Sequence, residues 1–419
     1  MTATPLAMIS EDASLKIARI DSEGADWRAQ VETRLEMRDE GMVFMWPSWS
    51  PNGDRITVSA SSQRQDDPRL ELWNVPSGEG PAEVVFRNPR DGLQVIAPGL
   101  AHYVHWAPSG RALAVVGNVG SGLAVNLVAA NRPGQAQRLV DGAPLYFSWA
   151  PDGRAILVHR AAQLVLFDLA AGSEGPQQIQ RARPSFRSPA WSSDGSSIYF
   201  AKPRPGGGAI LVRAQRSEAG ASAEHDELME LSGPASFVAS PSDERLAVLT
   251  LGPGDAEGRK LSILDPETGG QVPIVDRTMN GVFWAPDGGA LFAFEPQPSS
   301  TMIGLTRYDL DRNGEFAGSM RLARFQPSAE FATMLNFYDQ FSHSHQVVSP
   351  CGRWITFAGL ALGNGGSGRR GFGPQNGCYL VPSDGSQAPR RVDAGSIAFF
   401  PASLDDDAGQ ASEAGEAAS

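Results

Sequence analysis

One short motif recurs along this chain: an apolar run that ends in Trp, followed by Ser or Ala, Pro, a polar residue and Gly. The clearest copy is Phe147-Ser-Trp-Ala-Pro-Asp-Gly-Arg-Ala-Ile-Leu-Val158. Pro presets φ for a turn and Gly readily takes the left-handed conformation, so the motif predicts a tight hairpin between two short strands.

The motif is spaced as a structural repeat. Clear copies contain five tryptophans, and weaker ones contain Pro241 and Pro350; the tryptophans are Trp49, Trp106, Trp149, Trp191 and Trp284. Aligned on the Pro position, consecutive copies are 42 to 64 residues apart. A repeat of about 40–50 residues built from short strands indicates the blades of a β-propeller. We therefore predict an all-β, single-domain propeller of four-stranded blades, with the five tryptophans buried between blades.

The two ends of the chain each contain an incomplete blade. Leu6–Ser10, Leu15–Ile20 and Gln30–Leu35 have the pattern of outer strands, whereas Ser396–Ser403 matches an opening strand whose later strands are missing. We predict that these segments pair in one composite blade, which removes the sheet edges that would otherwise invite aggregation. Eight blades are favoured, with seven as the alternative. The propeller is expected to span residues 1–404 and an acidic, disordered tail residues 405–419.

Composition limits the partners. The formal net charge of −12 argues against nucleic acid, whose phosphates are bound by clusters of Lys and Arg. No apolar run is long enough to insert into a membrane, and the first residues lack the features of a secretory signal. We therefore expect a cytoplasmic monomer in which Cys351 and Cys378 are free thiols.

The repeated Trp-(Ser/Ala)-Pro-(Asp/Asn/Ser)-Gly hairpin resembles the WD-like repeat of the TolB-type propeller family. The propeller domains of prolyl oligopeptidases and dipeptidyl peptidases and the oligogalacturonate lyases share this repeat, and the likeness covers about residues 40–403. It implies the propeller fold. TolB itself has a signal and an additional N-terminal domain, and the peptidases have a hydrolase domain with a Gly-x-Ser-x-Gly motif; this sequence contains neither. The lyases bind a metal through propeller histidines, a feature matched here only loosely.

Four of the six histidines form two pairs, and each pair lies at the start of a predicted inner strand. His102-Tyr103-Val-His105 leads into Trp106, and His343-Ser-His345-Gln346 leads into a later blade. Such a set could hold a divalent metal, with Gln346 as a supporting partner. The alternative is that each histidine is a hydrogen-bonded packing residue. No cofactor is predicted, and a divalent metal is the alternative.

Long inserts are expected to gather on one face. By connectivity, loops between second and third strands and loops between blades emerge on the same side; here these are Ser61–Pro68, Asn88–Pro98, the helical insert Ser328–Phe341 and Gly363–Gly377. The last of these is Gly-rich; it could present Arg369, Arg370 and Phe372 to a partner, and the alternative is a disordered linker. Only Arg216–Glu227 belongs on the opposite side. Because loops on a rigid scaffold commonly carry function, we expect this face to bind.

The sequence contains no linked acid, base and nucleophile motif. We therefore predict a non-catalytic scaffold that binds a protein or peptide, with contacts from Tyr103, the four histidines (His102, His105, His343 and His345), Gln346 and the loop residues Arg369, Arg370 and Phe372. The alternative is a metal-assisted lyase or hydrolase that acts on a small molecule or saccharide around the same histidines.

Overall fold

The computed structural model describes residues 3–403 except 24–25, 37–41, 63, 65, 121, 170–176, 182–185, 205–206, 219–224, 252–258 and 363–375. The chain forms two compact units. Unit 1 comprises Met1–Val140, Leu322–Met334 and Ser344–Ser419, and unit 2 comprises Asp141–Arg321 and Leu335–His343. Each unit is built almost entirely of short antiparallel strands. No helix among the described residues is long and apolar enough to cross a membrane.

Unit 1 contains three complete four-stranded sheets, with orders β3-β2-β1-β31, β4-β5-β6-β7 and β11-β10-β9-β8, together with β28, β29 and β30. The strands are β1 Thr4–Ser10, β2 Leu15–Glu23, β3 Asp26–Leu35, β4 Met42–Trp49, β5 Arg55–Ser62, β6 Leu70–Pro76, β7 Glu83–Arg87, β8 Tyr103–Trp106, β9 Ala112–Val119, β10 Gly122–Ala129, β11 Ala136–Gly142 (whose last two residues belong to unit 2), β28 Trp354–Ala361, β29 Asn376–Pro382, β30 Arg390–Asp393 and β31 Gly395–Phe399. A 3-10 turn, Arg90–Gly92, lies between β7 and β8.

Unit 2 repeats the plan in the sheets β12-β13-β14-β15, β16-β17-β18-β19 and β20-β21-β22-β23, followed by β24, β25 and β26. The strands are β12 Leu145–Trp149, β13 Ala155–Arg160, β14 Gln163–Asp168, β15 Gln177–Arg181, β16 Ala190–Trp191, β17 Ser197–Pro203, β18 Ala209–Gln215, β19 Asp226–Leu231, β20 Ala235–Ala239, β21 Leu246–Leu251, β22 Arg259–Leu264, β23 Gln271–Val275, β24 Gly281–Trp284, β25 Ala290–Pro296 and β26 Ile303–Leu310. A 3-10 turn, Arg216–Glu218, follows β18. The chain passes from unit 2 into unit 1 along β27 Phe316–Pro327.

The sheets that begin at a copy of the repeat motif open with the predicted hairpin. In the copy at Trp149, β12 pairs with β13, and the amide of Gly153 donates to the carbonyl of Ala150 at 2.9 Å. Gly153 has φ of 66°, a conformation that disfavours any residue with a Cβ. We call the end at which the first strand of a blade begins the entry end, and the end that leads into the turn the hairpin end.

The repeat tryptophans are buried as predicted. Their exposed fractions lie between 3% and 7%. Trp106 on β8, for example, packs in one cluster with Leu72 on β6 and Val85 and Phe86 on β7, so it fills the space between two neighbouring sheets. Its indole nitrogen also donates to the hydroxyl of Thr57 at 3.2 Å.

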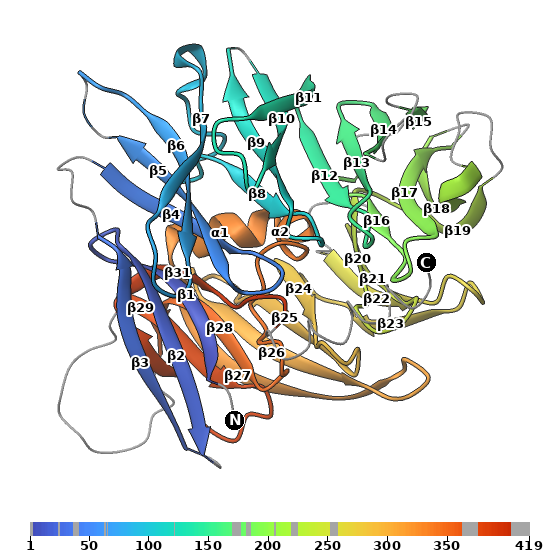
Figure 1. Cartoon of the computed structure of the whole chain (residues 1–419). Helices are drawn as coiled ribbons and strands as arrows, with labels where there is room; N and C mark the ends of the chain where they lie inside the picture. The colour runs from blue at the N-terminus through green and yellow to red at the C-terminus, as the bar shows by residue number, and fades with distance from the viewer. Residues whose placement is uncertain are drawn as a thin grey trace, which may run out of the picture. The chain divides into compact units, whose positions relative to one another are not determined.

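The predicted composite blade is present. β31 pairs antiparallel with β1, with Ala7 opposite Phe399 and Ile9 opposite Ile397, so the N-terminal and C-terminal strands lie side by side in Figure 1. The indole of Trp49 donates to the carbonyl of Phe399 at 2.8 Å. β31 therefore takes the place of a preceding inner strand for the sheet that contains Trp49.

The helical insert forms two short helices, α1 Ala329–Asn336 and α2 Tyr338–Phe341. As predicted, Ser328 caps α1: its hydroxyl accepts the amide of Phe331 at 3.1 Å. Phe331, Met334 and Tyr338 are fully buried, so the apolar face packs within the protein. Cys351 and Cys378 are free, as expected.

Candidate functional site

His102 is a packing residue whose two ring nitrogens are both hydrogen-bonded. Nδ1 lies 3.0 Å from the hydroxyl of Ser59, and Nε2 lies 2.9 Å from Oδ1 of Asn88. The Asn88 amide nitrogen donates to the carbonyl of Gly92, so its oxygen faces the ring and Nε2 carries the proton. Burial lowers the pKa of His102 to about 4, so the ring is neutral near pH 7. The side chain fixes the segment between β7 and β8.

A second histidine belongs to a chain of hydroxyl groups in unit 1. The Tyr103 hydroxyl lies 2.9 Å from Oγ of Ser344, which lies 2.6 Å from Nδ1 of His345. His345 is 2% exposed and Tyr103 is 4% exposed. Burial lowers the pKa of His345 to about 3. The expected surface anchors Tyr103, His102 and His345 thus lie beneath the surface of the described structure.

Aromatic rings enclose His345. Its ring centroid is 4.7 Å from that of Phe399 and 6.2 Å from that of Trp46, both in edge-on geometry. Trp46 has φ of 55°, which costs about 1–3 kcal/mol for a bulky residue. Its indole nitrogen donates to the carbonyl of Gly99 at 2.6 Å, so this strained residue ties the segment after β7 to the inner strands. Sequence reasoning missed Trp46, Ser344 and Phe399.

The other residues that the sequence predicted for the binding site form no cluster in the described structure. His105 is half-buried on β8 opposite Ala114. Gln346 pairs through its backbone with Phe400, so it extends an inner strand. Arg369, Arg370 and Phe372 lie outside the described residues.

His343 lies in unit 2, close in sequence to a buried carboxylate. Its Nε2 is buried and has no hydrogen-bond partner among the described residues. Burial lowers the pKa of His343 to about 4, while the charge of Asp339 acts in the opposite direction. Among the residues that the structure describes, no group of three or more His, Cys, Asp and Glu side chains could hold a metal ion.

Helix α2 is fastened to the entry ends of the inner strands of unit 2. The Gln340 side chain accepts the amide of Phe147 at 2.9 Å and donates to the carbonyl of the same residue at 2.7 Å, so it pairs with β12 as a strand would. Asp339 is fully buried, and its Oδ2 accepts the amide of Ser188 before β16 at 3.4 Å. At β24, a Cβ added to Gly281 would meet Tyr338 at 2.9 Å, so only Gly allows this close approach.

The same helix positions a cationic and aromatic cluster that the sequence did not suggest. Arg187 lies with its guanidinium carbon 5.4 Å from the ring centroid of Phe337, and its Nε is 3.8 Å from Oδ1 of Asp339. Its Nη1 donates to the carbonyl of Asn336. Tyr146, at the entry end of β12, interacts with Arg187 and Asp339; burial and Asp339 raise its pKa, while Arg187 opposes the rise.

We define Tyr146, Arg187 and Phe337 as the anchor cluster. All three side chains are half-buried, so each retains accessible surface. The guanidinium cannot move freely, because an aromatic ring, a carboxylate and a backbone carbonyl each contact it. The cluster therefore presents a rigid set of Arg and aromatic groups.

Known proteins with similar structures identify the fold class. No protein-family model matches the chain, and no match was found among curated proteins. The solved structures that match include three with TM-scores of 0.50 or above. A eukaryotic initiation factor has 12% identity and a TM-score of 0.53, covering 95% of this chain and 98% of that chain. An oligogalacturonate lyase in complex with manganese has 12% identity and a TM-score of 0.50, covering 84% and 85%.

The third is the β-propeller domain of the Trilobed protease from Pyrococcus furiosus, with 10% identity and a TM-score of 0.50, covering 85% of this chain and 100% of that domain. TolB from Acinetobacter baumannii matches at 17% identity with a TM-score of 0.36, and the match spans 62% of the TolB chain and 64% of this one. The propeller fold expected from the TolB resemblance is confirmed. Identities this low bear on the fold alone.

Proposed function

We propose that this chain is a non-catalytic binding module for a protein or peptide, and that it makes contact through the entry ends of its inner strands. The observation that carries the proposal is the anchor cluster. Arg, Tyr and Phe are enriched at protein interfaces, and groups that are already rigid lose little entropy on binding. The guanidinium carbon of Arg187 lies 5.4 Å from the ring centroid of Phe337, and its Nε lies beside Asp339, so the side chain is already positioned in the unbound protein.

The scaffold beneath the cluster supports this proposal. Gln340 anchors α2 to β12, and Asp339 anchors it to Ser188 in the segment before β16, so the cluster is tied to more than one blade. In unit 1, His102 and Trp46 hold the segment between β7 and β8, which leaves Val95 44% exposed. The entry ends in each unit thus present elaborated segments on a rigid base, as a recognition surface requires.

The alternative is a metal-assisted lyase or hydrolase at the histidines. His102 would have to break two hydrogen bonds, to Ser59 and Asn88, before either ring nitrogen could ligate a metal. That cost favours the binding module. Elemental analysis of the purified protein tests the alternative, because stoichiometric manganese, zinc or calcium would support it.

The proposal is tested by affinity capture from the native host with three versions of the full chain. The double variant R187A/F337A removes two anchors, whereas R216A is the matched control. Arg216 is also a partly buried arginine stacked on an aromatic ring, Trp191, and paired with Asp152, but it sits at the hairpin end of the same unit. We expect the wild type and R216A to recover the same partner and R187A/F337A to lose at least tenfold of it. Equal recovery by all three proteins would refute the proposal.

A further inference from the structure

A surface depression in unit 1 lies away from the entry ends. It has a volume of about 520 Å³ and is formed at the hairpin end of the sheet β11-β10-β9-β8. Its base is apolar and comprises Ala112 on β9 with Leu127 and Ala129 on β10. A depression of this size lies within the range of small-ligand sites.

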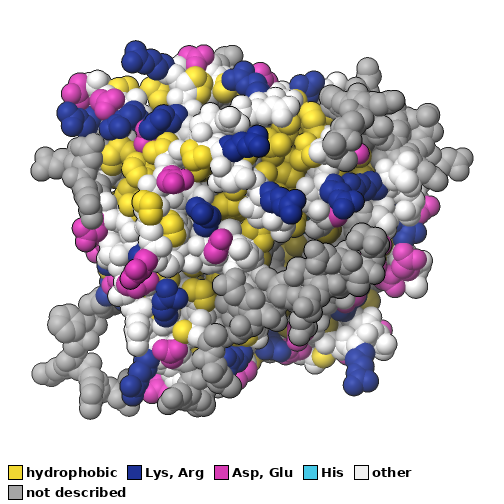
Figure 2. Space-filling view, viewed as in Figure 1, with side chains coloured by type: hydrophobic (Ala, Val, Ile, Leu, Met, Phe, Trp, Pro, Cys, Tyr) yellow, Lys and Arg dark blue, Asp and Glu magenta, His cyan; other side chains and the backbone are white. Residues whose placement is uncertain are grey.

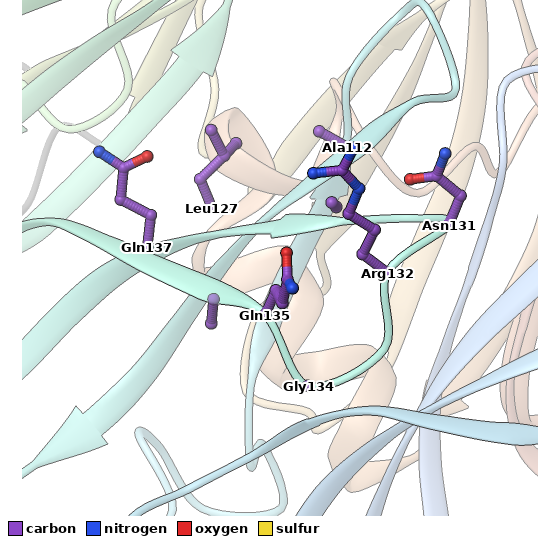
Figure 3. Close-up of a pocket in the computed structure, with 9 residues that line it drawn as sticks. Ala112, Leu127, Asn131, Arg132, Gly134, Gln135 and Gln137 are labelled. Carbon is purple, nitrogen blue, oxygen red and sulfur yellow. The ribbon is translucent and has the colours of Figure 1, made fainter.

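The rim of the depression is polar. Asn131, Arg132 and Gln135 belong to the turn between β10 and β11, and Gln137 lies on β11. Figure 3 shows these side chains and Leu127 extending to the same side of the strands. Backbone hydrogen bonds hold the turn. Within it, the amide of Gln135 donates to the carbonyl of Arg132 at 3.2 Å, and the amide of Gly134 donates to the carbonyl of Val85 on β7 at 3.2 Å. The rim residues therefore project from a fixed base.

The rim of the depression carries a positive charge. Arg132 forms no ion pair with any residue that the structure describes, although the protein carries a formal net charge of −12. Many other arginines face a carboxylate, as Arg213 faces Asp226 at 3.0 Å and Arg390 faces Asp26 at 2.9 Å. On the face in Figure 2, Lys and Arg side chains are interspersed with Asp and Glu. An arginine left unpaired at the edge of a depression is suited to an anionic ligand.

The guanidinium, the side-chain amides and the apolar base each indicate one part of a ligand. A guanidinium binds a carboxylate through two parallel hydrogen bonds. The side-chain amides of Asn131, Gln135 and Gln137 can each donate and accept, which matches peptide groups. The base of Leu127, Ala112 and Ala129 suits a small aliphatic side chain. We infer that this depression binds the free carboxyl end of a peptide whose last residue is aliphatic.

This site is independent of the anchor cluster, because it lies at the hairpin end of a sheet in unit 1 and shares no residue with the cluster. Its failure would leave the proposed function untouched. A free aliphatic carboxylic acid offers the same charge and apolar group without peptide groups, so the test includes both kinds of ligand.

The experiment is a saturation-transfer difference NMR titration of the full chain with three probes: acetyl-alanyl-leucine, its C-terminal amide and 4-methylpentanoate. We expect saturable binding of the acetyl dipeptide with a millimolar or lower Kd, and binding at least tenfold weaker for the amide and for 4-methylpentanoate. Arg132→Gln should weaken binding of the dipeptide at least tenfold. Gln135→Ala should weaken it about threefold.

The control variant is Arg111→Gln. Arg111 is an exposed arginine next to Ala112 that does not line the depression, so its loss should change the Kd by less than twofold. An equal loss with Arg111→Gln and Arg132→Gln would show general charge attraction and overturn the inference. No saturable binding up to 20 times the expected Kd, or equal affinity for the acid and the amide, would also overturn it. Tighter binding of 4-methylpentanoate than of the dipeptide would contradict a peptide ligand.

Discussion

At the scale of single residues, the paired histidines show that one sequence pattern is compatible with two different roles, metal ligation and packing. Paired histidines at the start of inner strands are compatible with a metal site, and the sequence could not decide between ligation and packing. The decision depends on neighbours that are remote in sequence. His102 is hydrogen-bonded to Ser59, 43 positions away, and Tyr103 to Ser344, 241 positions away. Neither contact could be predicted from the spacing of residues near the histidines.

His102 should make the protein sensitive to acid. Its folded pKa is about 4, whereas an unfolded histidine titrates near 6.5. Between these values the unfolded chain binds more protons, so the stabilisation is complete above pH 6.5 and is lost as the pH falls toward 4. Between pH 7 and pH 5 the free energy of unfolding should fall by about 2 kcal/mol more in the wild type than in His102→Gln. Urea unfolding at the two pH values measures this, and an equal fall in both proteins would contradict it.

At the scale of elements, α2 replaces a strand partner. Its Gln340 satisfies the backbone of Phe147 at the open edge of β12, and Asp339 does the same for Ser188. The sequence predicted a packed helix from its apolar face and its Ser328 cap, and both were correct. It could not predict the polar docking, because Gln340 and Phe147 are 193 positions apart and neither belongs to a recognisable motif.

Gln340→Ala should loosen this docking. The change removes the two hydrogen bonds from Gln340 to the buried amide and carbonyl of Phe147, and each loss costs about 1–3 kcal/mol. We expect a loss of about 3 kcal/mol in urea unfolding and faster hydrogen exchange at the Phe147 amide. Asn336→Ala is the control, since that side chain is exposed and the change keeps the backbone carbonyl that accepts from Arg187. Slow exchange at Phe147 in Gln340→Ala would show that Gln340 does not protect the strand edge.

At the scale of the whole molecule, most of the architecture could be predicted from the sequence. The turn motif has a local physical cause, the left-handed Gly after Pro, and its repetition identifies the blades. The composite sheet could also be predicted, because each end of the chain contained strands that lacked partners. The strained Trp46 and the anchor cluster could not, since they arise only when segments remote in sequence meet.

The composite sheet should contribute strongly to stability. Removing Ser396–Ser419 eliminates most of β31, which pairs with β1 and accepts the hydrogen bond of Trp49 at Phe399. The edge of β1 would then be unpaired. We expect the melting temperature to fall by several degrees and aggregation to increase. Removing only Ala408–Ser419 leaves every described contact in place, so it should change neither the melting temperature nor aggregation. Equal melting temperatures of the two deletion variants would show that β31 is dispensable.

The central claim is that the entry ends of the inner strands form the binding surface. Site-specific photo-crosslinking tests it most directly, with benzoylphenylalanine placed at Phe337 in one protein and at Phe316 in another. Phe316 opens β27 at the hairpin end of unit 2 and is 46% exposed, so it is more accessible to chance encounters than the half-buried Phe337. We expect the protein labelled at Phe337 to crosslink to the native partner and the protein labelled at Phe316 not to do so. Crosslinking from Phe316 alone would contradict it.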